Sequence, residues 1–299
     1  MTTSDSPDDR HDKTIDPRDR LKSVAHATAS ADNPRNDPGV EAHRRLSAGK
    51  TFEVVRRDGE EEMARPATSL AFSGLAAGLA IGFSVVTEAV MNTHLPADAV
   101  WAPLIANMGY TIGFILVIVG GMQLFTENTI IPVATLCKSP TRRNFLRLAR
   151  IWGLVLGANM LGAVLFATFM MKTSAVPPNV QDAILGLGRH ASDGGFIVTM
   201  TKGIGAGFLI AALGWLLAGR QSGEVVLVFI ITYVVALAGF SHVVAGTVEM
   251  AALVVVGHTG IGEAIFGFIL PALIGNILGG TFLFTFLTYG QIREELPKR

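Results

Sequence analysis

Two apolar runs in this 299-residue chain are too long to cross a lipid bilayer once as straight helices. They cover roughly residues 99–137 and 223–257, and each would extend about 50 Å or more at 1.5 Å per residue, whereas the hydrocarbon core is about 30 Å thick. Polar residues stand near the middle of both runs, in QLFTENT (123–129) and GFSHVVAG (239–246). Non-helical backbone is tolerated at this depth only inside protein or beside a wet cavity. We therefore predict two interrupted helices.

Four other apolar runs have the length of a single crossing, which needs about 20 helical residues. They cover roughly 68–90, 146–171, 196–219 and 262–289. The pattern predicts an all-α membrane protein with six transmembrane helices, of which the second and the fifth are broken.

Charged residues lie mostly outside these runs and divide the chain into three parts. Half of all residues are hydrophobic and only 16% are charged, yet residues 1–65 are dense in Asp, Glu, Lys, Arg, Ser and Pro. We predict a disordered cytoplasmic tail at 1–65, a transmembrane domain at 66–290 and a short cytoplasmic C-terminus at 291–299. The N-terminus lacks the pattern of a cleavable signal peptide, so the first spanning helix is expected to direct insertion.

The two halves of the apolar region echo each other. Asn-x-Leu-Gly occurs at Asn159 and again at Asn276, and Thr126 and His242 precede these asparagines by similar distances. Three helices per half would start the second copy from the opposite side of the membrane, which predicts inverted repeats. Paired interrupted helices are typical of a transport site, so Thr126 and His242 are expected to meet near mid-membrane. Chance similarity between two glycine-rich stretches is the alternative.

The distribution of basic residues predicts the orientation. Lys and Arg crowd the stretch 138–150, and Arg220 lies in another loop on the same side. The positive-inside rule places both termini in the cytoplasm, in the plasma (inner) membrane of a bacterium. The formal net charge of zero gives no reason to expect nucleic-acid binding.

At this point the motifs match a known family. LFTENT (124–129), GFSHVVAG (239–246) and PALIGNILGG (271–280) resemble the formate/nitrite transporter family over about 68–290, and LFTEN is similar to its divergent, YfdC-like branch. The resemblance implies an aquaporin-like six-helix protomer, a homopentamer in the bilayer and a separate pore in each protomer. It implies passage of a small monovalent anion, or of its weak acid together with a proton, and neither a cofactor nor a metal.

The resemblance also assigns residues to the pore. The central histidine of the family falls on His242 and the threonine of the second-helix loop on Thr126, while Leu124 and Phe125 fall where apolar side chains narrow the pore. The fourth-helix asparagine of the family falls on Gly207. From its own position, Phe240 is a third candidate constriction.

Three ionisable residues complete the predicted pathway, because such residues inside a membrane are functional candidates by default. Lys202 either pairs with Glu249 or Glu127, which would offset the cost of burying both charges, or faces the pore and attracts an anion. Asn159 and Asn276 are expected to support the broken helices by hydrogen-bonding their exposed backbone.

The resulting hypothesis is a channel-like transporter for a small monovalent anion or weak acid, proton-linked through His242. A neutral-solute channel of the aquaporin type is one alternative, although the chain lacks paired Asn-Pro-Ala motifs. A membrane scaffold acting through the tail is another. An intramembrane enzyme has little support, since one buried histidine without a matched cluster is no catalytic constellation.

Overall fold

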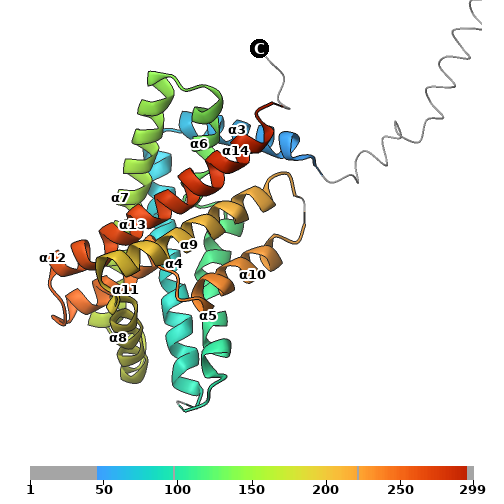
Figure 1. Ribbon diagram of the computed structural model, residues 1–299. Coiled ribbons are helices and arrows are strands. Elements are labelled where there is room, and N and C mark those ends of the chain that lie inside the picture. Colours follow the sequence, from blue (N-terminus) through green and yellow to red (C-terminus); the bar gives the residue numbers. More distant parts are fainter. Residues whose placement is uncertain (1–45, 97, 221, 295–299) are drawn as a thin grey trace, which may run out of the picture. The chain divides into compact units, whose positions relative to one another are not determined.

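The computed structural model describes residues 46–96, 98–220 and 222–294, which are helical with short connections (Figure 1). The chain divides into two units, Met1–Leu46 and Ser47–Arg299, and the second carries everything described below. Its α-helices are α3 (Ala48–Ala64), α4 (Ala67–His94), α5 (Ala102–Val119), α6 (Ile131–Lys138), α7 (Arg142–Lys172), α8 (Pro178–Ser192), α9 (Gly195–Leu217), α10 (Glu224–Leu237), α11 (Val243–Val255), α12 (Ile261–Glu263), α13 (Leu270–Ile277) and α14 (Phe286–Ile292). A 3-10 turn, η2 (Glu127–Thr129), and two π-helical segments, η3 (Ala264–Ile269) and η4 (Leu278–Thr285), join them.

Length and composition make this an all-helical membrane protein. Within the described residues, 5 helices are long and apolar enough to cross a bilayer: α4, α5, α7, α9 and the continuous segment Ile261–Ile292. Helices α10 and α11 are apolar but shorter, because they are the two parts of one long apolar run.

Both long runs are interrupted at their polar centres by the same kind of helix end. Gly121 and Gly239 follow α5 and α10 with φ of 63° and 61°, a conformation that only glycine adopts without a steric penalty. The next amides, of Met122 and Phe240, donate back to carbonyls five residues earlier, at 2.9 and 3.0 Å. These Schellman-type ends satisfy helix carbonyls and release the chain into the segments before α6 and α11.

Helix α3 corrects the predicted tail boundary. Residues 47–64, assigned above to a disordered tail, belong to the membrane unit, because Phe52, Val55 and Met63 form a buried apolar stripe at helical spacing. The predicted boundary at residue 65 therefore lies too far along the chain, and the rest of the predicted tail, residues 1–45, lies outside the described residues.

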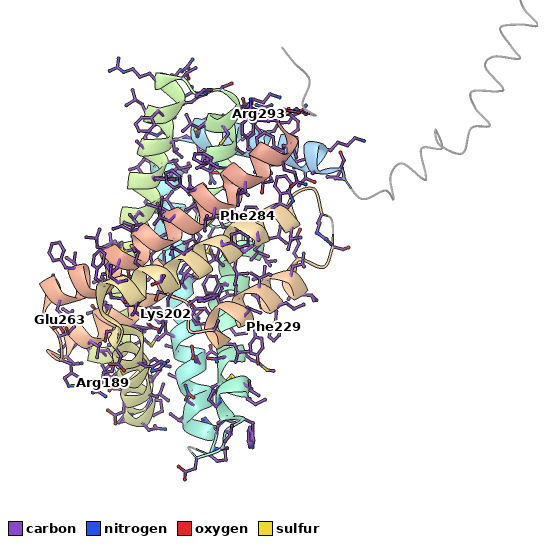
Figure 2. The ribbon with its side chains drawn as sticks, in the orientation of Figure 1. Arg189, Lys202, Phe229, Glu263, Phe284 and Arg293 are labelled. Carbon is purple, nitrogen blue, oxygen red and sulfur yellow. The ribbon has the colours of Figure 1, made fainter. Side chains whose placement is uncertain are left out.

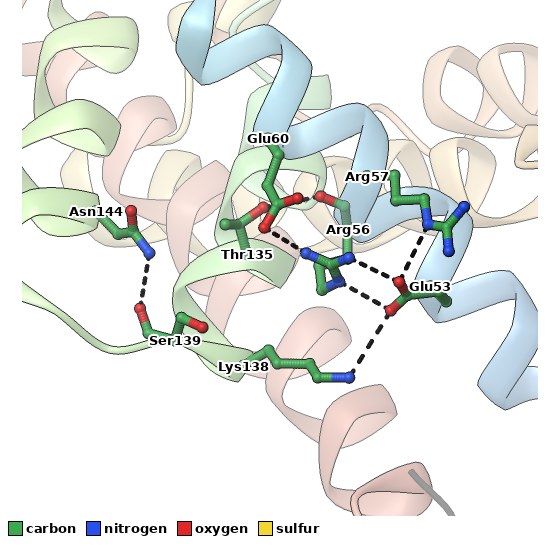
Figure 3. Close-up of polar contacts among 8 residues, drawn as sticks. All are labelled: Glu53, Arg56, Arg57, Glu60, Thr135, Lys138, Ser139 and Asn144. Carbon is green, nitrogen blue, oxygen red and sulfur yellow. Dashed lines mark hydrogen bonds and ion pairs between the residues drawn. The ribbon is translucent and has the colours of Figure 1, made fainter. Parts of the chain in front are cut away.

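Polar contacts also hold α3 against α6 (Figure 3). Glu53 bonds Arg56 at 2.6 Å and lies 3.8 Å from Lys138 of α6, while the Thr135 hydroxyl donates to the Arg56 carbonyl at 3.0 Å. The hydrogen bonds from Arg56 hold the pKa of Glu53 well below its usual range, at about 2. The carboxylate of Glu53 therefore stays ionised at any physiological pH.

Helix α8 lies between the predicted spans 146–171 and 196–219. Val180, Ile184, Leu185 and Gly188 are buried on one face, and the helix packs against α4 and α11. Its four-residue apolar spacing is helical, but the helix is too short to span a bilayer.

Candidate functional site

His242 and Thr126 meet at the two helix interruptions. His242 is 2% exposed and ends the segment before α11, where its Nδ1 accepts the amide of Ala245 at 3.3 Å and so caps the helix. Its Nε2 lies 2.8 Å from the hydroxyl of Thr126. Because Nδ1 acts as an acceptor, the hydrogen bonds assign the proton of the neutral ring to Nε2, which donates to Thr126.

Asn159 of α7 holds the first interruption in place. Its Oδ1 accepts the amide of Phe125 at 2.9 Å, and its Nδ2 donates to the carbonyls of Gly74 and Gln123 at 2.8 and 2.9 Å. One buried side chain thus satisfies backbone groups that the broken helix leaves without partners.

Asn276 of α13 makes the matching set of bonds at the second interruption. Its Oδ1 accepts the amide of Val243 at 2.9 Å, and its Nδ2 donates to the carbonyls of Gly203 and Ser241 at 2.9 and 2.8 Å. Each asparagine therefore accepts an amide with its Oδ1 and donates to a carbonyl with its Nδ2 at the interruption in its own half of the chain.

Apolar side chains flank Thr126 on one side. Leu124 and Phe125 are fully buried, and the ring of Phe125 packs edge-on against Trp152 with centroids 5.7 Å apart. The indole N–H of Trp152 donates to the Asn128 carbonyl at 2.9 Å, which anchors the segment beyond Thr126. Phe114 packs edge-on against the His242 ring at 4.9 Å.

Beyond Leu124, α3 closes a polar network around Gln123. The Gln123 amide side chain donates to Glu62 at 2.8 Å and accepts from Asn128 at 3.2 Å. Glu62 also pairs with Arg65 at 3.1 Å. Glu127 lies within electrostatic reach of Glu62, so it belongs to the α3 side of the site.

A cavity of about 90 Å³ adjoins His242, and we call it the polar chamber. Its lining draws on helices α4, α5, α8, α9 and α11, and Phe240 forms part of its wall and packs its ring onto Gly205. The titratable side chains that face it are Glu88, Tyr110, His190, Lys202, His242 and Glu249.

The surroundings of Lys202 bear on whether it pairs with Glu249, pairs with Glu127 or faces the cavity. Lys202 projects from α9 (Figure 2) and shares the chamber with Glu249, yet among the described residues no ion pair within 4.0 Å joins it to Glu249 or Glu127. Glu127 does not line the chamber. Of the three arrangements considered, the structure places Lys202 in the cavity without a bound carboxylate.

Gly207 occupies a packing position and not the pathway predicted for it. A Cβ atom built there would collide with the backbone carbonyl of Asn276, so the glycine allows α9 and α13 to approach closely. Gly78 has the same relation to Asn159 in α7.

Three titratable residues of the chamber are not among those predicted above: Glu88, Tyr110 and His190. The signal for Glu88 is present in the sequence, since it is the one carboxylate within the apolar run 68–90 and such residues merit attention by default. Tyr110 and His190 carry no comparable signal. They reach the chamber only through the packing of α5 and α8.

Comparisons with known proteins identify the family to which this chain belongs. Residues 49–290 match the formate/nitrite transporter family, which covers most of the chain. The chain belongs to the formate/nitrite transporter family. The matched span begins inside α3, so this helix is part of the family's region and not of a separate tail. The resemblance predicted from the motifs is confirmed.

Relatives agree with this membership. The inner membrane protein YfdC of Escherichia coli (strain K12) is 34% identical over 247 residues, covering 83% of this chain and 79% of the relative. The formate channel FocA of Escherichia coli (strain K12) is 28% identical over 215 residues, covering 64% of this chain and 74% of FocA. A solved pentameric formate channel with formate bound superposes with a TM-score of 0.65 at 20% identity, over 76% of this chain and 98% of that chain, which shows a common fold.

Proposed function

We propose that this member of the formate/nitrite transporter family is a channel-like transporter for a small monovalent anion or its weak acid. The observation that carries the proposal is the His242–Thr126 pair, held at two helix interruptions between a buried apolar neck and a polar chamber. FocA, a relative, is named a formate channel, which is the chemistry the proposal assigns to this chain.

The proposed architecture has six crossings arranged as two inverted three-helix repeats. The matching bonds of Asn159 and Asn276, and the matching glycine ends at Gly121 and Gly239, support a repeat. The similar solved channel is pentameric, which supports a homopentamer. The basic stretch 138–150 favours cytoplasmic termini, and the relative YfdC is an inner membrane protein, which favours the inner membrane here.

The proposed permeation step passes two apolar constrictions: Phe240 in the wall of the polar chamber, and the buried neck of Leu124 and Phe125 beyond Thr126. Such a neck penalises a bare ion far more than a neutral molecule, so the substrate crosses it as the neutral acid and flux is linked to protons. His242 meets the substrate between the neck and the chamber, and its cap on α11 and bond to Thr126 keep the ring orientation fixed.

Flux into liposomes tests the proposal. Purified protein is assayed with formate, nitrite, acetate, lactate and glycerol at external pH 5 to 8, beside the variant His242→Asn. Uptake of a weak acid is expected to rise as the pH falls and to collapse in the variant. The matched control His94→Asn alters an exposed histidine at the end of α4 and should leave flux unchanged.

Other outcomes would replace the proposal. Glycerol flux without acid flux would make this a neutral-solute channel. No flux of any solute would favour a scaffold acting through the N-terminal tail.

A further inference from the structure

Two carboxyl groups in the polar chamber have no role in the site as described so far. Glu88 of α4 and Glu249 of α11 are 8% and 9% exposed and both line the cavity next to His242. Among the described residues, neither carboxyl has a hydrogen-bond or ion-pair partner, and neither does the ammonium of Lys202. Buried ionisable groups without partners are costly, so their presence calls for a ligand or a transferable proton.

The surroundings of the pair favour a shared proton. Glu88 and Glu249 line the same cavity of about 90 Å³ as the Tyr110 side chain. Two carboxyl groups that face one small cavity favour keeping at least one proton, because ionising both would bring two like charges together. The other titratable groups facing the pair are His190 of α8, Lys202 of α9 and His242 before α11, and only Lys202 brings a fixed positive charge.

We propose that Glu88 and Glu249 form a proton-donor site that converts an arriving carboxylate anion into its neutral acid, with Lys202 holding the anion. The proposal rests on the proposed function. The O–H bond of one carboxyl breaks while an O–H bond forms on the substrate oxygen, so the negative charge passes from substrate to protein. A hydronium ion from the bulk solution returns a proton to the carboxylate and leaves a water molecule behind, and the reverse order of steps serves export.

The position of the pair suits this step. Glu249 lies seven residues beyond His242, about 10 Å along α11 at 1.5 Å per residue, so proton transfer occurs in the chamber, before the substrate passes His242 and the buried Leu124 and Phe125. A neutral acid then reaches His242, whose Nε2–H is a hydrogen-bond donor already oriented by Thr126. Anion capture and neutral passage are thereby assigned to different residues.

The test compares a substrate that needs a proton with one that does not. Proteoliposomes with wild-type protein or with Glu88→Gln/Glu249→Gln are assayed for formate uptake and internal acidification at external pH 7 and 5, and for permeation of formamide, an uncharged analogue. At pH 7 the double variant should lose formate flux by at least about tenfold, the low end of what a positioned proton donor contributes. At pH 5 the deficit should shrink, because neutral formic acid is about a hundredfold more abundant than at pH 7 for an ordinary carboxyl pKa.

Formamide permeation distinguishes a proton-transfer role of the pair from a purely structural role. It should be unchanged in the double variant, and Glu249→Asp, which keeps a carboxyl, should recover part of the formate flux at pH 7. Lys202→Met should raise the KM for formate and leave formamide permeation alone. Glu263→Gln, which changes an exposed carboxylate outside the chamber, is the matched control and should behave as wild type.

Two results would overturn the inference. Undiminished formate flux in the double variant at pH 7 would remove the pair from proton transfer while leaving the proposed function intact. Equal losses of formate and formamide would reduce the pair to a structural role. Absence of formate, nitrite or acetate flux in the wild type would instead refute the proposed function itself.

Discussion

At the scale of single residues, the site depends on two asparagines more than on the residues they position. Each asparagine makes three hydrogen bonds, two of them to backbone groups at a helix interruption and one to a carbonyl inside a neighbouring helix. A buried polar group that loses its partner costs about 1–3 kcal/mol. The asparagines avoid this cost by bonding the backbone groups that an interrupted helix leaves unpaired. His242 and Thr126 can then meet at hydrogen-bond distance.

Replacing Asn276 by leucine should destabilise the protein strongly. Asn276→Leu leaves the Val243 amide and the Ser241 carbonyl without their partner, which predicts a loss of about 2–6 kcal/mol from two buried groups. Thermal unfolding in detergent, read beside the yield of folded protein, measures the loss. Asn92→Leu, at an exposed position on α4, is the control, and equal stability of the two variants would contradict the prediction.

Restoring the family's asparagine at Gly207 should harm the protein. The space for a Cβ atom is already occupied by the Asn276 backbone, and overpacking of this kind costs about 1–3 kcal/mol or more. Gly207→Asn should therefore lower the melting temperature, whereas Gly186→Ala, which has open space on α8, should not. A stable Gly207→Asn variant with increased flux would return the position to the pathway.

At the scale of elements, α3 links the residues around Gln123 to the rest of the fold. It contacts the loop before α6 through Glu62 and Gln123, and it contacts α6 through Glu53 and Thr135. Its buried stripe supplies the main contact, since exposed ion pairs contribute less than about 1 kcal/mol each. The polar contacts chiefly fix the register of α3 on α6.

The Glu53 network should be insensitive to pH in the range used for transport. A carboxyl whose pKa in the folded protein is lowered to about 2 from 4.5 stabilises at every pH above the ordinary value, and that stabilisation is lost only as the pH falls towards 2. Glu53→Gln should increase amide hydrogen exchange in α3 by the same factor at pH 5 and at pH 8. A factor that changes between these two values would show that another group controls α3.

At the scale of the whole molecule, the apolar helices and the two interruptions form one unit from Ser47 onward. The unit contains the neck, the His242–Thr126 pair and the polar chamber, and the family match begins within its first helix. Transport should therefore depend on this unit and not on the residues before it.

Two truncations test this division. Removing residues 1–45 should leave formate flux within about twofold of the full chain. Removing 1–64 also removes the buried Phe52 and Val55, and the loss of each large core side chain should lower the free energy of unfolding by up to about 3–5 kcal/mol. Flux in liposomes and size-exclusion profiles report the two effects. Loss of flux on removing 1–45 alone would show that transport depends on residues before Ser47.

Much of this protein follows from its sequence. Apolar runs of spanning length, two of them interrupted by glycine and polar residues, determine an all-helical membrane fold, because backbone in lipid must satisfy its own hydrogen bonds. The motifs around Thr126, His242 and Asn276 determine the family. Local signals suffice for both, since they depend on residues close together in the chain.

Tertiary structure alone decides what gathers at the site. Helix α3 resembled a charged tail in the sequence because its apolar stripe is sparse, and α8 was not among the predicted spans because it is too short to cross a bilayer. The chamber joins Glu88, Lys202 and Glu249 from three helices, and Gly207 is excluded from the pathway by a neighbouring backbone. Contacts between helices far apart in the chain depend on packing geometry, which the apolar pattern of each helix leaves undetermined.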